Sequence, residues 1–143
     1  MHKKVELKVK IRLATLEEHI VLTMFDHHID EEELVIAIEL GRVSIVQDEE
    51  DEFVGWLRYN LFWDQIPFVN MLYIREEYRN QGYGKKLMEC FEEDMKELGY
   101  DKLMVSTQDN ETAKYFYIKI GYKIIGGFTI PNEEYELILH KNI

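Results

Sequence analysis

Apolar and charged residues alternate at the start of this chain, as they do in a half-exposed β-strand. From Val5 to Leu13 the odd positions are apolar and the even positions are charged, which predicts a strand there. Two further apolar runs, Phe53 to Phe62 and Ile66 to Ile74, are separated by Trp63-Asp64-Gln65. They predict a pair of strands joined by a short turn, with Pro67 near the start of the second strand.

Helical signals occupy the intervals between these runs. Thr15 precedes Glu18 by three residues and Asp30 precedes Glu33 by the same spacing, which predicts two capped helices. The first helix is expected from about Leu16 to His27 and the second to end at Gly41. A third helix is expected to end near Gly99, with Leu87, Phe91, Met95 and Leu98 on one face. A fourth helix is expected to follow the capping residues 108–111 and to run to about Ile120, with Gly121 at its C′ position.

The remaining strands are short and complete the order of elements. They are expected at 42–46, 102–107, 122–125 and 135–140, the last two separated by Gly126-Gly127 and Pro131-Asn132. The resulting order is β-α-α-β-β-β-α-β-α-β-β. Hairpins in the middle and strand-helix-strand crossovers later predict an α/β (mixed α+β) fold, in which a mixed sheet is flanked by helices.

Length and composition indicate one globular domain spanning residues 1–143. The chain has 143 residues, of which 46% are hydrophobic, and this is enough for a sizeable core. No apolar run approaches the roughly 20 residues that span a bilayer, and the charged start has no secretory apolar segment. Cys90 is the only cysteine, so no disulfide within the chain can form. A cytoplasmic location is therefore expected.

The net charge of −11 argues against nonspecific binding of nucleic acid and favours cationic partners or simple solubility. Residues 48–52 are five consecutive acids, for which a solvated hairpin tip is the expected role and docking of a basic partner the alternative. Positive charge is concentrated instead between Arg75 and Lys86, where four cations accompany two acids.

This basic segment contains Arg79-Asn80-Gln81-Gly82-Tyr83-Gly84-Lys85-Lys86, between an expected strand and an expected helix. The first amides of a helix have no intrahelical partner and carry partial positive charge, so the segment suits a phosphate group. Glycines let the backbone approach such an anion closely. The spacing Arg-x-x-Gly-x-Gly differs from both the Walker loop and the dinucleotide-binding loop, and by itself it is also compatible with a purely structural turn.

A second motif follows about thirty residues later, from Asn110 to Tyr122, with the pattern Asn-x-x-Ala-x-x-Phe-Tyr-x-Lys-x-Gly-Tyr. The two motifs, in this order and within this order of elements, resemble the GNAT superfamily of acyl-CoA-dependent N-acetyltransferases over essentially the whole chain. The resemblance implies a mostly antiparallel sheet of six to seven strands with about four helices, and acetyl-CoA as cosubstrate.

The resemblance also assigns the cofactor contacts by position. The backbone of the fourth strand, at Leu72, Tyr73 and Ile74, is expected to pair with the pantetheine arm. Asn110 matches a position that contacts the cofactor, and Phe116 matches a packing position near it. Glu76 stands where many members have proline. The residues expected around the pyrophosphate are Arg79, Asn80, Gln81, Gly82, Tyr83, Gly84 and Lys85.

Tyr117 matches the position of the family's usual general acid. A phenol, with a reference pKa of about 10, stays protonated at neutral pH and can donate a proton to a departing thiolate. Tyr117 lies seven residues after Asn110, about two helical turns, so both are expected to face one groove. Periodicity alone favours the alternative that Tyr117 is a helix residue that packs on the sheet, and its position in the family motif is what favours the acid role. The sequence singles out no general base; the candidates are Glu76, Asp64, His27 and His28.

No metal site is expected, because adjacent histidines without a partner motif are a weak signal. The hairpin with Trp56, Tyr59, Phe62, Trp63 and Asp64 is a candidate for recognition of a cationic amine through cation–π attraction. The expected activity is direct acetyl transfer to a primary amine of a small molecule, peptide or protein. The alternatives are a catalytically silent acyl-CoA-binding regulatory module and an interaction domain that uses its acidic face. The oligomeric state is open, and the resemblance makes a homodimer one expected assembly.

Overall fold

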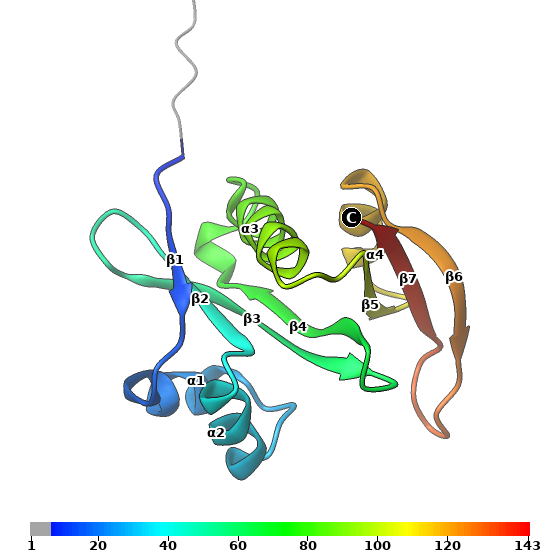
Figure 1. Ribbon diagram of the computed structural model, residues 1–143, viewed down its shortest axis with the longest axis horizontal. Helices are drawn as coiled ribbons and strands as arrows, with labels where there is room; N and C mark the ends of the chain where they lie inside the picture. Colours follow the sequence, from blue (N-terminus) through cyan, green and yellow to red (C-terminus); the bar gives the residue numbers. More distant parts are fainter. Residues whose placement is uncertain (1–6) are drawn as a thin grey trace, which may run out of the picture. The chain divides into compact units, whose positions relative to one another are not determined.

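The computed structural model describes residues 7–143, which form a seven-stranded sheet and four α-helices (Figure 1). The strands are β1 (Lys10–Leu13), β2 (Val43–Gln47), β3 (Phe53–Phe62), β4 (Ile66–Ile74), β5 (Lys102–Gln108), β6 (Lys123–Phe128) and β7 (Glu136–Asn142). The helices are α1 (His19–Phe25), α2 (Glu31–Glu39), α3 (Tyr83–Glu97) and α4 (Ala113–Lys119), with short 3-10 helices η1 (Leu16–Glu18) and η2 (Glu76–Tyr78). The expected α/β fold class and the order of strands and α-helices are confirmed.

The hydrogen-bonded strand order is β1-β2-β3-β4-β5-β7-β6. The pairs β1–β2, β2–β3, β5–β7 and β6–β7 are antiparallel, whereas β4 and β5 are parallel, with Phe68 opposite Met104 and Val69 opposite Val105. The parallel pair is connected through α3, as a parallel connection requires a crossover. The sheet is therefore mixed and mostly antiparallel, as expected.

The chain divides into two compact units. The first contains the residues up to Tyr59 together with Met71–Cys90, and the second contains Asn60–Asn70 and Phe91–Ile143. The strands β3 and β4 and the helix α3 contribute residues to both units. That residues 1–143 form a single domain stays a prediction.

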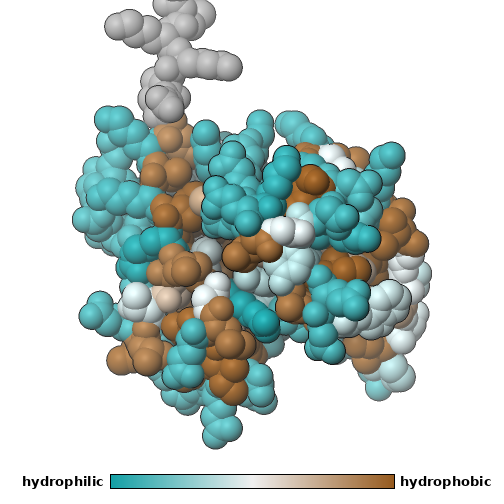
Figure 2. Space-filling view, viewed as in Figure 1, coloured by the Kyte–Doolittle hydropathy of each residue, from teal (hydrophilic) through white to brown (hydrophobic). Residues whose placement is uncertain are grey.

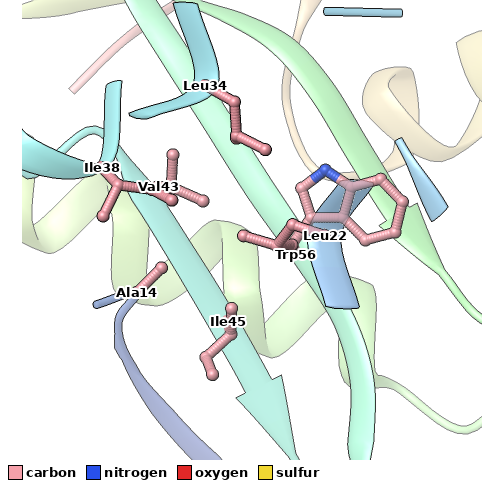
Figure 3. Packing of buried hydrophobic residues seen from close by; sticks show 7 residues of the cluster. All are labelled: Ala14, Leu22, Leu34, Ile38, Val43, Ile45 and Trp56. Carbon is pink, nitrogen blue, oxygen red and sulfur yellow. The ribbon is translucent and has the colours of Figure 1, made fainter. Parts of the chain in front are cut away.

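The core of the first unit lies between α1, α2 and the strands β2 and β3 (Figure 3). The two helices contribute Leu22, Leu34 and Ile38, all of them buried. Facing them are side chains from the strands and from the end of β1: Ala14, Val43, Ile45 and Trp56. The period-2 pattern of β2 and the helical spacing of α2 thus direct their apolar faces into one core.

A buried polar network ties the end of α1 to β3 inside this unit. The Asp26 carboxylate is fully buried and accepts hydrogen bonds from Arg58 Nε at 2.7 Å, Arg58 Nη2 at 3.3 Å and Trp56 Nε1 at 3.1 Å. The amide of His28 donates to the same carboxylate at 3.1 Å. Because every oxygen is hydrogen-bonded, the buried charge is compensated, and the segment after α1 is held in place.

At the start of the chain the regular elements are shorter than expected. Of the strand expected over Val5–Leu13, Val5 and Glu6 lie outside the described residues and only Lys10–Leu13 pairs with β2. The expected first helix begins as η1 and ends at Phe25, because Asp26 leaves the helical conformation to bind Arg58. The capping box of Thr15 and Glu18 is confirmed, whereas Asp30 makes no side-chain cap.

Towards the end of the chain, Gly126-Gly127 does not separate two strands, as expected, but lies inside β6. The absence of a Cβ at Gly127 explains this, since an added Cβ would lie 2.4 Å from the Glu136 carbonyl oxygen of β7. The reversal occurs later, at Pro131-Asn132, where Asn132 has a positive φ of 69°. Within residues 7–143, no helix combines the length and the apolar character needed to cross a membrane.

The buried Asp26 network predicts how substitutions change the free energy of unfolding. Replacing Asp26 with Asn leaves the buried Arg58 guanidinium without a counter-charge, so we expect the free energy of unfolding to fall by about 3–5 kcal/mol. Urea unfolding measures the change. The matched control is Asp51→Asn, which removes an exposed ion pair with Lys10 and should cost less than about 1 kcal/mol. Equal losses in the two variants would show that the network is not a major source of stability.

Candidate functional site

The end of β4 is fastened to β3 at a bulge. The register of β2 and β3 shifts between Val46, opposite Gly55, and Gln47, opposite Phe53, so that Val54 is the additional residue. Its carbonyl accepts the amide of Arg75 at 2.8 Å, and the Phe53 carbonyl accepts Nη1 of Arg75 at 2.9 Å. Arg75 is therefore committed to holding the chain where β4 ends, and most of its charge is not free for an anion.

Gly55 sets the distance between the two strands. An added Cβ there would lie 2.1 Å from the Tyr73 carbonyl oxygen and 3.1 Å from the Cα of Ile74. No side chain can be accommodated without displacing the last residues of β4. The glycine thus fixes the backbone of the segment from Leu72 to Ile74, which is the segment expected to pair with pantetheine.

Arg79 folds back onto this same segment. Its Nε donates to the Ile74 carbonyl at 2.8 Å, and its guanidinium carbon lies 5.2 Å from the centre of the Tyr73 ring. The side chain is otherwise exposed, so its terminal nitrogens face outward from a fixed position. The structure brings Tyr73, Ile74 and Arg79 together, as the sequence prediction requires.

The turn that follows leads into the first amides of α3. Asn80 and Gly82 have positive φ values of 62° and 95°, and the Gln81 side chain donates to the Glu77 carbonyl at 3.1 Å. The amide of Lys86 donates to the Gly82 carbonyl at 3.1 Å as the helix begins. The amides of residues 83–85 precede it and have no carbonyl four residues back within the helix. The first turn contains no acidic residue, so the helix start suits an anion.

Tyr83 contributes to this turn only through its backbone. Its side chain is buried and contacts the ring of Tyr78 edge-on, with the ring centres 5.7 Å apart. The Tyr78 hydroxyl in turn donates to Asp48 at 3.2 Å. Residues 49–52 of the acidic loop are exposed, as expected, whereas Asp48 is half-buried and supports η2. Lys85 is exposed and lies 4.0 Å from Glu89, which leaves its charge largely available.

A hollow of about 540 Å³ lies in the same unit but contains none of the expected site residues. Its lining includes Lys8, Lys10, Glu49 and Lys86. Lys8 forms an ion pair with Glu49 at 3.2 Å, and Lys10 forms one with Asp51. Two of its three cations are therefore paired already, and the start of α3 remains the better anion site.

In the second unit, the end of β5 leads into the turn with Asn110 and then into α4. Asn110 is exposed and precedes the first helical residue, Ala113, by three positions. Lys114 closes the turn by donating to the Asp109 carbonyl at 2.6 Å and to its carboxylate at 2.9 Å. The helical spacing expected between Asn110 and Tyr117 is therefore wrong, because only Tyr117 belongs to the helix.

Tyr117 is buried, with 5% of its surface exposed. Its ring contacts Phe116 and Tyr122 edge-on, with centres 5.2 and 5.8 Å apart. Burial, followed by the negative charge of Glu111, raises the pKa of the Tyr117 phenol well above its usual value. The phenol therefore remains protonated throughout the neutral and moderately alkaline range.

A second set of contacts holds the end of α4 in place. The Tyr122 hydroxyl donates to Glu92 of α3 at 2.9 Å, and Lys141 of β7 donates to the same carboxylate at 2.9 Å. Lys141 also donates to the Ile120 carbonyl at 2.9 Å. Burial and then the charge of Glu92 raise the pKa of Tyr122, so it stays a hydrogen-bond donor. These contacts fix Tyr122, against which Tyr117 packs.

The candidate bases occupy different settings. Glu76 is exposed at the start of η2, and His27 and His28 are exposed in the segment held by Asp26. Asp64 is exposed in the β3–β4 turn. Nothing in these positions singles out one of them. Among residues 7–143, no group of three or more His, Cys, Asp or Glu side chains is arranged to hold a metal ion.

The aromatic hairpin does not form one recognition surface. Trp56 is 1% exposed and belongs to the core, with its ring centre 4.9 Å from that of Tyr73. Trp63 is 75% exposed at the turn, where it and Asp64 have φ values of 53° and 59°. Phe62 and Trp63 lie against each other with centres 4.7 Å apart. Trp56 is therefore not accessible to an external ligand, whereas Tyr59 and Phe62 are half-buried and Trp63 and Asp64 are exposed.

Sequence reasoning missed two elements of this arrangement. Gly55 interrupts an otherwise apolar strand, and an isolated glycine in a strand signals a bulge or close backbone approach. Arg58 in the same strand signals a buried partner, which is Asp26. Neither signal names the partner, because the contacts join residues far apart in sequence.

Comparison with known proteins agrees with this geometry. A model of the acetyltransferase (GNAT) family matches residues 13–122. Ard1 from Thermoplasma volcanium has a similar structure, with a TM-score of 0.80, 14% identity and coverage of 94% of this chain and 97% of that chain. The ribosomal-protein-S18-alanine N-acetyltransferase from Escherichia coli gives a TM-score of 0.78, with 13% identity and coverage of 95% and 94%.

A third similar structure, the PaiA N-acetyltransferase from Thermoplasma acidophilum in complex with coenzyme A, gives a TM-score of 0.77, with 16% identity and coverage of 96% of this chain and 100% of that chain. A search of curated protein sequences found no match. The family match covers most of the chain, and the structural likenesses show the same fold. The chain belongs to the GNAT acetyltransferase family, so it is an acetyltransferase and acetyl-CoA is its cosubstrate.

Proposed function

We propose that this protein transfers the acetyl group of acetyl-CoA directly to a primary amine of a small molecule, peptide or protein, within a ternary complex. The observation that carries the proposal is the start of α3, where the first amides, which have no partner within the helix, follow a turn with positive φ at Asn80 and Gly82. Two similar structures belong to N-acetyltransferases, one of them in complex with coenzyme A. A cytoplasmic location is part of the proposal and rests on the single cysteine, Cys90.

In this proposal the cofactor contacts divide by chemistry. The pyrophosphate accepts hydrogen bonds from the amides of residues 83–85, with Arg79 and Lys85 supplying positive charge. Asn80, Gln81 and Gly82 shape the turn. The pantetheine arm pairs with the backbone of Leu72, Tyr73 and Ile74 in the manner of an added strand. Asn110 and Phe116 are assigned to the cofactor by their positions in the second motif.

The proposed reaction uses Tyr117 as the general acid. The neutral amine attacks the thioester carbonyl, the new C–N bond forms, and the C–S bond breaks as the tetrahedral intermediate collapses. The sulfur leaves with the electron pair of that bond and takes the phenolic proton of Tyr117. The nitrogen loses one proton to a base or to water, and a proton from solvent then restores the Tyr117 phenol. The raised pKa of Tyr117 keeps the phenol protonated at the start of each turnover but also makes it a weaker acid, so the transfer depends on the negative charge that develops on the sulfur.

A cationic acceptor fits the charge of the chain. The net charge of −11 attracts a protonated amine, and the exposed turn offers the Trp63 ring beside the Asp64 carboxylate. The amine must lose a proton before it attacks, and Glu76, Asp64, His27 and His28 are the candidate bases. The proposal leaves the choice among them to experiment.

The cofactor site is tested by thermal unfolding with acetyl-CoA and, in parallel, with free CoA. Ligand at about 100 times its dissociation constant adds about 2.7 kcal/mol of stability, so we expect the midpoint to rise by several degrees. The control variant Lys96→Ala removes an exposed cation from the far end of α3 and should retain the shift. No shift for the wild-type protein at millimolar ligand would mean that the glycine turn is only structural.

The acid role is tested by Tyr117→Phe. Loss of the phenolic proton should lower kcat at least about tenfold, with acetyl-CoA binding retained. Tyr115→Phe is the matched control, because Tyr115 lies on the same helix but is 64% exposed, and its activity should be unchanged. Unchanged turnover in Tyr117→Phe would remove it from the acid role. Wild-type binding of acetyl-CoA without any acetylated product across varied amines would favour the silent binding module.

The position of β4 is tested by Gly55→Ala. The added Cβ must displace the Tyr73 carbonyl, so we expect the dissociation constant for acetyl-CoA to rise at least about tenfold. Titration calorimetry, performed well below the unfolding midpoint, gives the constant. Gly126→Ala is the control, since an added Cβ there meets no atom within 4 Å. If both variants bind equally well, the close approach at Gly55 does not govern the cofactor segment.

A further inference from the structure

The helix α1 is apolar on its outer side as well as on the side that faces the core. Leu22 is buried in the core, whereas Leu16, Ile20 and Met24 follow one another at four-residue spacing and are 53, 72 and 67% exposed. A residue two positions from Leu22 lies about 200° around the helix, so Ile20 and Met24 are on the opposite face. The helix contains no Lys, Arg, Asp or Glu, and His19 is its only ionisable residue. A helix that is apolar all round is usually buried, so its outer side is expected to be covered.

The helix α2 extends this exposed apolar surface. Ile36 and Leu40 are 47 and 58% exposed on the side of α2 that faces away from the core. Because both helices turn their inner faces to β2 and β3, their outer faces belong to one surface. In Figure 2, brown atoms gather in the region of α1 and α2, with teal atoms around them. This outer apolar face consists of Leu13, Leu16, Ile20, Met24, Ile36 and Leu40.

The charge around the outer apolar face is strongly negative. Between Arg12 and Arg42 the sequence contains eight acidic residues and no lysine or arginine. Two of the eight acids are buried and paired, Glu18 with Arg12 and Asp26 with Arg58. The other six are exposed: Glu17, Asp30, Glu31, Glu32, Glu33 and Glu39. The stretch also contains three histidines: His19, which lies 3.2 Å from Glu31, His27 and His28.

Several of the exposed acids lie on the same helix faces as the apolar side chains. Glu32 and Glu33 precede Ile36 by four and three residues, and residues at these spacings are neighbours on a helix surface. Glu17 likewise precedes Ile20 by three residues. The outer apolar face is therefore framed by negative charge.

Two other surfaces of the described chain have only one of these two properties. The loop 48–52 is acidic, but no large apolar side chain is exposed within residues 42–62, and Lys8 and Lys10 pair with two of its acids. The strand β6 exposes Ile124 and Ile125, but charges of both signs accompany it, Lys123 within the strand and Glu136 opposite its end.

We propose that the outer apolar face binds a cationic amphipathic segment of another protein. The apolar residues of that segment would cover Leu16, Ile20 and Met24, and its lysines or arginines would face the surrounding acids. The same acids repel an anionic membrane and the equivalent face of a second copy. This interaction goes beyond the proposed activity and does not depend on acetyl-CoA.

Titration calorimetry of the full chain with a synthetic amphipathic peptide of leucine and lysine tests the proposal. The control peptides are one with glutamate in place of every lysine, and polylysine of the same length. We expect the leucine–lysine peptide to bind at least about tenfold more tightly than either, because only this peptide matches both the apolar surface and its charge. Added salt should weaken the binding, since it screens exposed charges.

The variant Ile20→Lys assigns the binding to the outer apolar face. It places a positive charge under the peptide, so we expect the dissociation constant to rise at least about tenfold. Ile20 is 72% exposed, and the variant should keep its fold. Leu98→Lys is the matched control, because Leu98 is 66% exposed outside α1 and α2, and it should bind the peptide as the wild type does.

A second pair of variants tests the charges. The double variant Glu32→Gln with Glu33→Gln should weaken binding of the leucine–lysine peptide and reduce its salt dependence. Glu49→Gln with Glu50→Gln makes the same change of charge in the acidic loop and should leave the binding unchanged.

Four results would overturn the proposal. The first is the absence of peptide binding to the wild-type protein up to about 1 mM. The second is equal weakening by Ile20→Lys and Leu98→Lys, and the third is equal weakening by the two glutamine double variants. The fourth is a dimer, or binding to phosphatidylcholine vesicles, that Ile20→Lys abolishes, because the face would then belong to a second copy or to a membrane.

Discussion

The close approach of β3 to the end of β4 is the constraint from which the first half of the site follows. Gly55 lets the Tyr73 carbonyl come nearer than any Cβ would allow, and the bulge at Val54 turns a carbonyl towards the amide of Arg75. The chain must then leave β4 in one direction, through η2 and into α3. Arg79 completes the arrangement by binding back to Ile74. The helix start is therefore positioned by backbone geometry before any ligand is present.

Backbone groups, more than side-chain charges, suit this turn to an anion. The Arg75 side chain donates to the Phe53 carbonyl and forms an ion pair with Glu77. Arg79 donates its Nε to the Ile74 carbonyl. The amides of residues 83–85 have no partner within the helix, and the positive φ of Gly82 is accessible mainly because glycine lacks a Cβ. Fixed amides cost little reorganisation when a phosphate binds. The cations then add attraction in a chain that is otherwise strongly acidic.

Local sequence patterns predicted the local features well and the long-range ones poorly. The capping box at Thr15, the bounds of β3 and β4 and the glycine turn depend on neighbouring residues, and all are found. The Asp26–Arg58 pair joins positions 32 apart, so no local pattern could name its partner. For the same reason the sequence suggested that Trp56 recognises a ligand, whereas the indole hydrogen-bonds to Asp26 in the core.

Burial of Tyr117 destabilises its phenolate much more than its neutral phenol, and this difference bears on the proposed chemistry. A phenolate there would lack solvation and would face the charge of Glu111, so the protonated form persists whenever the site is empty of thiolate. In the proposed reaction, a thiolate that forms against the hydroxyl would change this balance, because the hydrogen bond would strengthen as negative charge develops on sulfur. The stabilisation is then greatest at the transition state, which is the condition for faster turnover rather than tighter ground-state binding. The contacts of Tyr122 with Glu92 support this by keeping the packing around the phenol fixed.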